Sequence, residues 1–276
     1  MKKSTLLIVA TTALTSLVAI TARAQNPVVV NKIYVTSFKS AKVRVFLTNG
    51  MPTKPNVKTQ LNPTGVAVAS NGNVYVANFG ANTVTTYDAT GKPISPTITG
   101  LSGPFALTFD PFSGLLCVLN QTSATITKYQ ADGTLVGTIN LPALSTDSDG
   151  FAIALDGTFW VSQTSYGNMV HLDQTGNLLN SYSVGGTPAG VALPSDGSVL
   201  FADTNDNAVL RLDPSTGNVT TFVSGLAKPL GLAIDGNGNV YVSNSGSNTV
   251  TTYDSTGNAT TPTLSTSAYP VGIAVR

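Results

Sequence analysis

The stretch GVAVASNGNVYVANFGANTVTTYDATG, from Gly65 to Gly91, contains the unit that decides the fold. A small residue opens an apolar run, Asn71-Gly72 supplies a turn, and a second apolar run follows. The segment Gly72–Gly91 recurs almost unchanged at Gly238–Gly257, with 16 identical positions. Asn-Gly and the closing Asp-Ala-Thr-Gly are both typical of turns between neighbouring antiparallel strands. The unit is therefore predicted to be a set of short strands joined by tight turns.

Similar units recur along the whole chain at a nearly constant spacing. The small residues that open them are Gly65, Ala106, Gly150, Gly190, Gly231 and Gly272, separated by 41, 44, 40, 41 and 41 residues. Each complete unit divides into four short strands, and no segment after Ala24 shows a competing helical periodicity. A period of this size built from strands and turns is typical of a β-propeller. We expect an all-β fold with four strands per blade.

The two ends of the chain complement each other. The C-terminus supplies only an inner strand, Val271–Val275, whereas the N-terminus supplies Ile33–Thr36, Lys42–Phe46 and an outer strand after them. We therefore predict a six-bladed β-propeller whose last blade is closed by the N- and C-terminal strands, which leaves no long exposed sheet edge. The small opening residues should let six inner strands approach closely. Stability should come from apolar faces stacked between blades.

Residues 1–24 have the features of a secretory signal peptide. Lys2 and Lys3 precede an apolar stretch, Thr5–Ile20, and Ala22-Arg23-Ala24 forms a small-x-small cleavage site. The apolar stretch is too short for a stable membrane span. We expect residues 25–276 to be a single propeller domain, exported to the periplasm or the extracellular medium without membrane insertion.

Composition excludes several functional classes. Removing the leader leaves 11 basic and 13 acidic residues, so no basic footprint for nucleic acid is present. Cys117 is the only cysteine and lies in an apolar run, which predicts a buried strand residue rather than a reactive thiol.

The units resemble NHL repeats, which combine a small-residue inner run, a second strand ending in Asp, an Asn-x-Arg segment and a closing Asp-x-x-Gly turn. The unit opening at Gly190 fits best, with Val199–Asp203, Asn207 and the turn Asp213–Gly217. The likeness covers residues 33–276, and the chain is also similar to the six-bladed propellers that include gluconolactonases and streptogramin B lyases. The arginine of the repeat is replaced throughout, by Val84, Thr125, Val170, Val209 and Val250. The resemblance therefore implies the fold but not the binding chemistry of NHL proteins.

In the propellers that this chain resembles, ligands bind at one mouth of the central channel. One polar residue per blade ends a second strand at the expected rim: Ser37, Asn78, Asn120, Gln163, Asp203 and Asn244. Such a ring could hold a polar ligand or one cation. The alternative is that these side chains cap strand ends by bonding to loop backbone. Several aromatic residues could line a pocket for a sugar or peptide: Phe79, Phe105, Phe151, Trp160 and Tyr166. Trp160 lies within a strand, however, and is expected to pack between blades.

Four loop aspartates are the candidates for a metal site: Asp147, Asp149, Asp203 and Asp206. Calcium needs six to eight oxygen ligands, but no calcium-loop spacing is present, and solvated loop acids are the alternative. The resemblance implies a metal-binding Glu in gluconolactonase-like enzymes and a His with a Glu in streptogramin lyases. This sequence contains no Glu, and His171 is its one histidine. One histidine cannot build a zinc site of the usual kind.

These observations favour an exported, non-catalytic propeller that binds a protein or small polar ligand at its rim, without a cofactor. The alternative is a diverged metal-dependent lactonase or lyase that would require a divalent cation.

Overall fold

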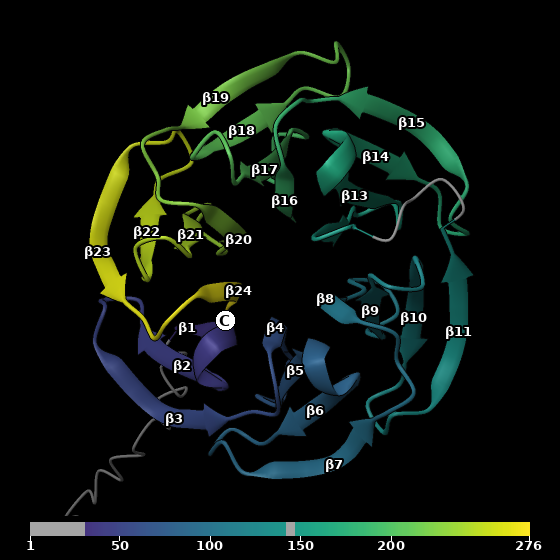
Figure 1. The fold of residues 1–276 in the computed structure, drawn as a ribbon, viewed down its shortest axis with the longest axis vertical. Coiled ribbons are helices and arrows are strands. Elements are labelled where there is room, and N and C mark those ends of the chain that lie inside the picture. The colour runs from purple at the N-terminus through teal and green to yellow at the C-terminus, as the bar shows by residue number, and fades with distance from the viewer. Residues whose placement is uncertain (1–30, 142–146) are drawn as a thin grey trace, which may run out of the picture.

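The computed structural model describes residues 31–141 and 147–276, and these residues form six four-stranded antiparallel sheets around a central axis (Figure 1). We number the blades from the unit opening at Gly65: blade 1 spans residues 63–98, blade 2 104–140, blade 3 151–183, blade 4 188–223 and blade 5 229–265. Blade 6 combines residues 270–275 with residues 32–58. The predicted all-β, six-bladed propeller is confirmed. The predicted signal peptide, residues 1–24, lies outside the described residues.

Strands in equivalent positions have similar lengths except for β12, which is shorter than the other innermost strands. The innermost strands are β4 Pro63–Val68, β8 Pro104–Phe109, β12 Phe151–Ile153, β16 Pro188–Ala192, β20 Pro229–Ile234 and β24 Pro270–Val275. The second strands are β1 Lys32–Ser37, β5 Val74–Asn78, β9 Leu116–Asn120, β13 Phe159–Gln163, β17 Val199–Asp203 and β21 Val240–Asn244. The third strands are β2 Lys42–Leu47, β6 Thr83–Tyr87, β10 Thr125–Tyr129, β14 Asn168–Leu172, β18 Ala208–Leu212 and β22 Thr249–Tyr253. The outermost strands are β3 Pro52–Lys58, β7 Pro93–Ile98, β11 Leu135–Asn140, β15 Leu178–Ser183, β19 Val219–Val223 and β23 Ala259–Ser265.

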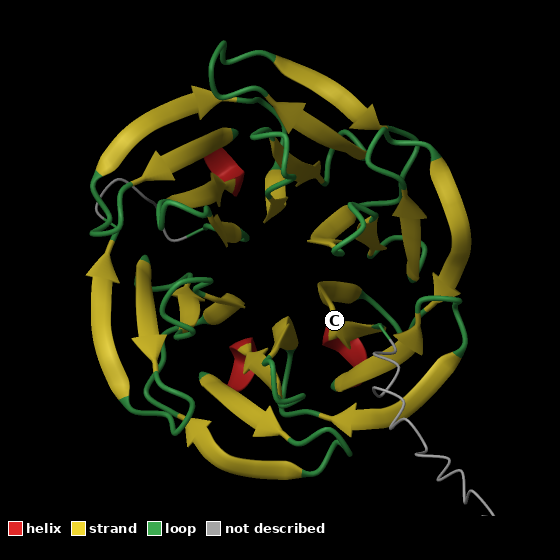
Figure 2. Cartoon of the chain, turned by 180° about the vertical axis from the view of Figure 1, so that it is seen from behind, coloured by secondary structure: helices red, strands yellow, loops and turns green. Residues whose placement is uncertain are grey.

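Helical structure in the described residues is limited to three single turns of 3₁₀ type, η1 Phe38–Ser40, η2 Phe79–Ala81 and η3 Thr164–Tyr166. Each turn directly follows a second strand, and Figure 2 shows the three around the channel. No helix of the described residues is long and apolar enough to cross a membrane.

The two ends of the chain close the ring as predicted. Strand β24 pairs antiparallel with β1, and Tyr34 lies opposite Ala274. Two reciprocal backbone hydrogen bonds extend this ladder. The N–H of Lys32 donates to the carbonyl oxygen of Arg276 at 2.5 Å, and the N–H of Arg276 donates to that of Lys32 at 3.0 Å. Blade 6 is therefore held together by hydrogen bonds between segments from opposite ends of the chain.

The core is divided into six apolar clusters, and each lies between two neighbouring blades. Strand β5 shows how this arises, because successive side chains of a strand point to opposite faces. Val74 and Val76 belong to the cluster shared with blade 6, whereas Tyr75 and Ala77 belong to the cluster shared with blade 2. Trp160 packs against blade 4, as predicted, in a cluster that includes Phe201.

Cys117 is fully buried in β9, which confirms the sequence prediction. Burial raises the pKa of its thiol to about 12, so the reactive thiolate is disfavoured at neutral pH.

The glycines that open the inner strands permit close approach, as predicted. A Cβ on Gly231 would lie 2.2 Å from the carbonyl oxygen of Val271 on the next blade. A Cβ on Gly272 would lie equally close to the carbonyl oxygen of Thr64. Since real Cβ atoms do not approach backbone oxygens so closely, these positions accept only glycine without movement of a blade.

Candidate functional site

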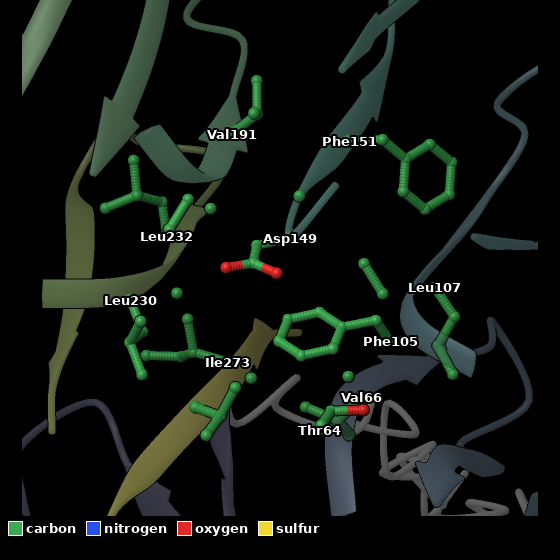
Figure 3. Close-up of a pocket in the computed structure, with 18 residues that line it drawn as sticks. Thr64, Val66, Phe105, Leu107, Asp149, Phe151, Val191, Leu230, Leu232 and Ile273 are labelled. Atoms are coloured by element: carbon green, nitrogen blue, oxygen red, sulfur yellow. The ribbon is translucent and has the colours of Figure 1, made fainter. Parts of the chain in front are cut away.

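The inner strands of all six blades enclose a small cavity of about 90 Å³ on the channel axis (Figure 3). A second cavity of about 430 Å³ continues along the same strands. The two share one apolar side chain per blade: Val66, Leu107, Phe151, Val191, Leu232 and Ile273. The channel is thus narrow and apolar at this level.

The mouth of the channel lies where the inner strands begin. The residue directly before the small opening residue lines the cavity in each blade: Thr64, Phe105, Asp149, Ala189, Leu230 and Val271. Asp149 is the one ionisable side chain among the residues that line this cavity. Figure 3 shows its carboxylate directed into the space between the blades, with the ring of Phe105 nearby.

Blade 3 departs from the other blades where it carries Asp149. The inner strands of the other five blades start with proline, two residues before the small residue, and blade 3 has Ser148 there. Proline favours the extended backbone that a strand needs. Strand β12 starts later, at Phe151, and has only three residues. Asp149 therefore belongs to a connection rather than to a strand.

Asp149 is held by neutral hydrogen-bond donors. The amide Nε2 of Gln121, from blade 2, donates to its Oδ1 at 2.5 Å. The Thr164 hydroxyl, which donates to the carbonyl oxygen of Pro188 at 2.9 Å, is a second neighbour of the carboxylate. Burial raises the pKa of the Asp149 carboxyl to about 6, the hydrogen bonds of Thr164 and Gln121 oppose this shift, and the negative charge of Asp147 adds to it. Among the residues that the structure describes, the ion pair formed is that between Arg211 and Asp196. Asp149 therefore has no cationic partner within the described residues.

The six predicted rim residues end the second strands and are buried, with exposed fractions of at most 7 %. None of them lines the cavity at Asp149. The Asn78 amide group donates to the carbonyl oxygen of Val76 and to the hydroxyls of Thr83 and Thr85. Equivalent bonds are made by Asn120 and Asn244.

Asp203 makes the contacts expected of a residue that caps a strand end. Its Oδ1 accepts hydrogen bonds from the backbone N–H groups of Thr187, Asn205 and Asp206 at 3.1–3.2 Å. Buried oxygens without a partner in the described structure remain on Ser37, Asn78, Asn120, Asp203 and Asn244. These contacts fix the loops around the mouth, and a direct role of the six residues in ligand binding stays a prediction.

The four aspartates of the candidate metal site have different environments. Asp147 accepts a hydrogen bond from the backbone N–H of Ser165 at 2.6 Å, whereas Asp203 is buried against backbone donors and Asp206 is exposed. Within residues 31–141 and 147–276, no three His, Cys, Asp or Glu side chains lie close enough to share a metal ion. The set does not come together as one group of ligands.

His171 lies on the third strand of blade 3 and does not line the channel cavity. Its ring stacks on Trp160 with 4.2 Å between centroids and 8° between planes. Its Nε2 lies 2.9 Å from the Thr158 hydroxyl. Burial lowers the pKa of His171, with an opposing effect from Asp156. His171 is thus a half-buried strand residue, and it forms no pair with Asp149.

Sequence reasoning missed Gln121 and the ring of apolar side chains below the mouth. Aligning the six units on their small opening residues would have revealed both the apolar ring and the isolated acid. Gln121 gives no such signal, since its contact with Asp149 depends on how blades 2 and 3 meet.

A ring of six antiparallel blades with one partly buried carboxylate in the cavity at the channel mouth defines a six-bladed propeller with a candidate axial binding site. Residues 18–276 match the Virginiamycin B lyase family, and the chain belongs to this family. No curated protein matches the chain.

Solved structures share the fold at low sequence identity. A virginiamycin B lyase from Staphylococcus aureus is 17% identical, with a TM-score of 0.64 over 83% of this chain and 79% of the other. A streptogramin B lyase is 19% identical, with a TM-score of 0.66 over 88% of this chain and 83% of the other. A protein of unknown function from Bacteroides caccae is 15% identical, with a TM-score of 0.74 over 89% of this chain and 98% of the other.

Proposed function

We propose that this chain is an exported, non-catalytic propeller that binds a protein or small polar ligand at the mouth of its central channel. The observation that carries the proposal is the composition of the cavity at that mouth, because Asp149 is the one ionisable residue among the side chains that line it. A single carboxylate can orient a ligand. General acid–base catalysis normally requires a titratable side chain positioned against a second reacting group. His171, the other candidate for such chemistry, lies elsewhere in blade 3, where it stacks on Trp160. In this proposal the buried rim residues hold the loops that shape the mouth.

The competing proposal is a diverged, metal-dependent lactonase or lyase, and membership of the Virginiamycin B lyase family favours it. The donor set at the mouth does not fit a bound divalent cation. Asp147 and Asp149 are its two carboxylates, and each already accepts a hydrogen bond. Calcium takes six to eight oxygens, and magnesium demands nearly ideal octahedral geometry.

A turnover assay separates the two proposals. Residues 25–276 would be incubated with a type B streptogramin and Mg²⁺, with the Staphylococcus aureus lyase as positive control, and products would be followed by mass spectrometry. We expect no turnover, and no rise in melting temperature with Mg²⁺ or Ca²⁺. A cation held at 100 times its dissociation constant would add about 2.7 kcal/mol to stability. Turnover by this chain would contradict the non-catalytic proposal.

The binding function is tested by capture on immobilised protein. Material exported by the source cells would be passed over the wild-type chain, over Leu230→Trp, which fills the mouth, and over Leu155→Trp. Leu155 is 80% exposed in the turn between β12 and β13, at the opposite end of the inner strands, so its variant is the matched control. We expect a ligand that the wild type and Leu155→Trp retain and Leu230→Trp loses. Equal retention by all three would place binding elsewhere.

A further inference from the structure

Asp149 is a partly buried carboxylate that lacks a countercharge. Removing an ionised carboxylate from water costs several kcal/mol unless a cation or strong hydrogen bonds compensate. Gln121 and Thr164 supply hydrogen bonds but no charge. Within the described residues, the ion pair that forms lies between Arg211 and Asp196, away from the mouth. The missing positive charge can therefore come from a ligand.

The groups that surround Asp149 define the electrostatics of the site. The other five blades present Thr64, Phe105, Ala189, Leu230 and Val271 at the same level, and none of these carries a charge. The charged group that acts on Asp149 is Asp147, from the same connection, and it is also negative. A cation that enters the mouth meets only favourable charges.

The shape of the cavity restricts what the cation can be. A volume of about 90 Å³ accommodates a short unbranched group. The ring of Phe105 and the aliphatic side chain of Leu230 line the same cavity as the carboxylate (Figure 3). Aromatic faces attract cations within about 6 Å, and aliphatic walls favour an apolar stem. A narrow chain with a positive tip satisfies both walls and the carboxylate.

A metal ion fits this environment poorly. The backbone oxygens of Thr64 and Val271 already accept hydrogen bonds from the hydroxyls of Thr36 and Ser243 on neighbouring strands. One carboxylate within an apolar ring cannot replace the hydration shell of a divalent cation. An organic cation needs fewer oxygens, because it forms only a few directed hydrogen bonds.

We propose that the channel mouth binds a primary ammonium group on an alkyl chain. The ammonium donates a hydrogen bond to the carboxylate of Asp149, and the alkyl stem lies against Phe105 and Leu230. This inference rests on the proposed binding function and specifies its ligand chemistry. A free alkylamine and a lysine side chain of an exported protein both carry this group.

Titration calorimetry with pentylammonium tests the inference on residues 25–276. At pH 8 we expect 1:1 binding by the wild type and none of comparable strength with 1-pentanol, the uncharged counterpart. Asp149→Asn should weaken binding at least tenfold. The matched control is Asp132→Asn, which removes an exposed acid in the turn between β10 and β11, and it should bind like the wild type.

The pH dependence gives a readout that needs no variant. Pentylammonium stays protonated between pH 5 and 8, whereas the Asp149 carboxyl, with a pKa of about 6, is mostly protonated at pH 5. Binding by the wild type should therefore be about tenfold weaker at pH 5 than at pH 8. Absence of binding at pH 8, or equal binding by Asp149→Asn, would overturn the inference.

Further outcomes distinguish a lysine side chain from a free amine as the ligand. They also distinguish failure of the ammonium inference from failure of the proposed function. A peptide with one lysine that binds more tightly than pentylammonium, and loses binding when the lysine is acetylated, assigns the site to a protein side chain. If pentylammonium binds more tightly than the peptide, the site is assigned to a free amine. If pentylammonium fails to bind while capture still depends on Leu230, only the ammonium inference falls. If no ligand is captured at all, the proposed function falls with it.

Discussion

Replacing Asp149 with Asn should stabilise the folded protein at neutral pH. Burial raises the pKa of Asp149 from 3.8 to about 6, and a pKa difference of one corresponds to about 1.4 kcal/mol. Ionised Asp149 therefore costs the fold on the order of 3 kcal/mol above pH 6. Asn retains an oxygen that accepts the hydrogen bond from Gln121 and lacks the charge that burial penalises. We expect Asp149→Asn to increase the free energy of unfolding by about 1–3 kcal/mol at pH 8.

The sign of the pH dependence distinguishes this mechanism from simple repacking. Because the pKa is raised in the folded state, the wild type binds more protons folded than unfolded between about pH 4 and 6. Its stability falls relative to the variant across that window, so the difference should be small at pH 4 and complete by pH 7. Aspartates with lowered pKa, such as Asp173 and Asp254 in exposed turns, act in the opposite direction. They are common to both proteins and cancel in the difference.

Urea unfolding of both proteins at pH 4, 5, 6, 7 and 8 measures the effect. A variant less stable than the wild type at pH 8, or a difference that does not change with pH, would refute the assignment of a partly buried charge without a countercharge to Asp149.

Three other predictions concern the fold. Gly231→Ala should lower the free energy of unfolding by about 1–3 kcal/mol or more, because its Cβ would meet the Val271 carbonyl oxygen. The control is Gly236→Ala, whose Cβ would have nothing within 4 Å. Equal stability of the two variants in urea unfolding would contradict the close packing of inner strands. Deleting Tyr269–Arg276 should abolish cooperative thermal unfolding because β1 loses its partner, and a soluble truncation of wild-type stability would contradict closure by both termini. Asp203→Ala should destabilise by about 1–3 kcal/mol, the cost of leaving buried N–H donors unpaired; an unchanged urea midpoint would argue against its loop-holding role.

The architecture was predictable because the same physical constraint repeats in every unit. An inner strand near the axis needs a small residue, and the chain supplies Gly or Ala at nearly constant intervals. The limits of the terminal strands were predicted to within one residue, as for β2, which was expected at Lys42–Phe46 and ends at Leu47. Closure was predictable from complementary halves of one unit at the two ends.

The channel site was only partly predictable. Asp149 was singled out from the sequence as one of four loop acids, but its isolation among uncharged side chains depends on how six blades converge. Gln121 contacts it across an interface between blades, at a sequence separation of 28 residues. The rim residues Asn78 and Asn244 were expected at strand ends, where they lie. Their burial and their bonds to threonine hydroxyls on the next strand required the three-dimensional structure.

The titration of the Asp149 carboxyl by ¹³C NMR, with and without pentylammonium, tests the role of the channel mouth most directly. We predict a midpoint near pH 6 in the free protein and a lower midpoint when the ammonium supplies the missing positive charge. A midpoint near the unperturbed value of 3.8 that pentylammonium leaves unchanged would contradict a partly buried carboxylate that lacks a countercharge and receives a cation.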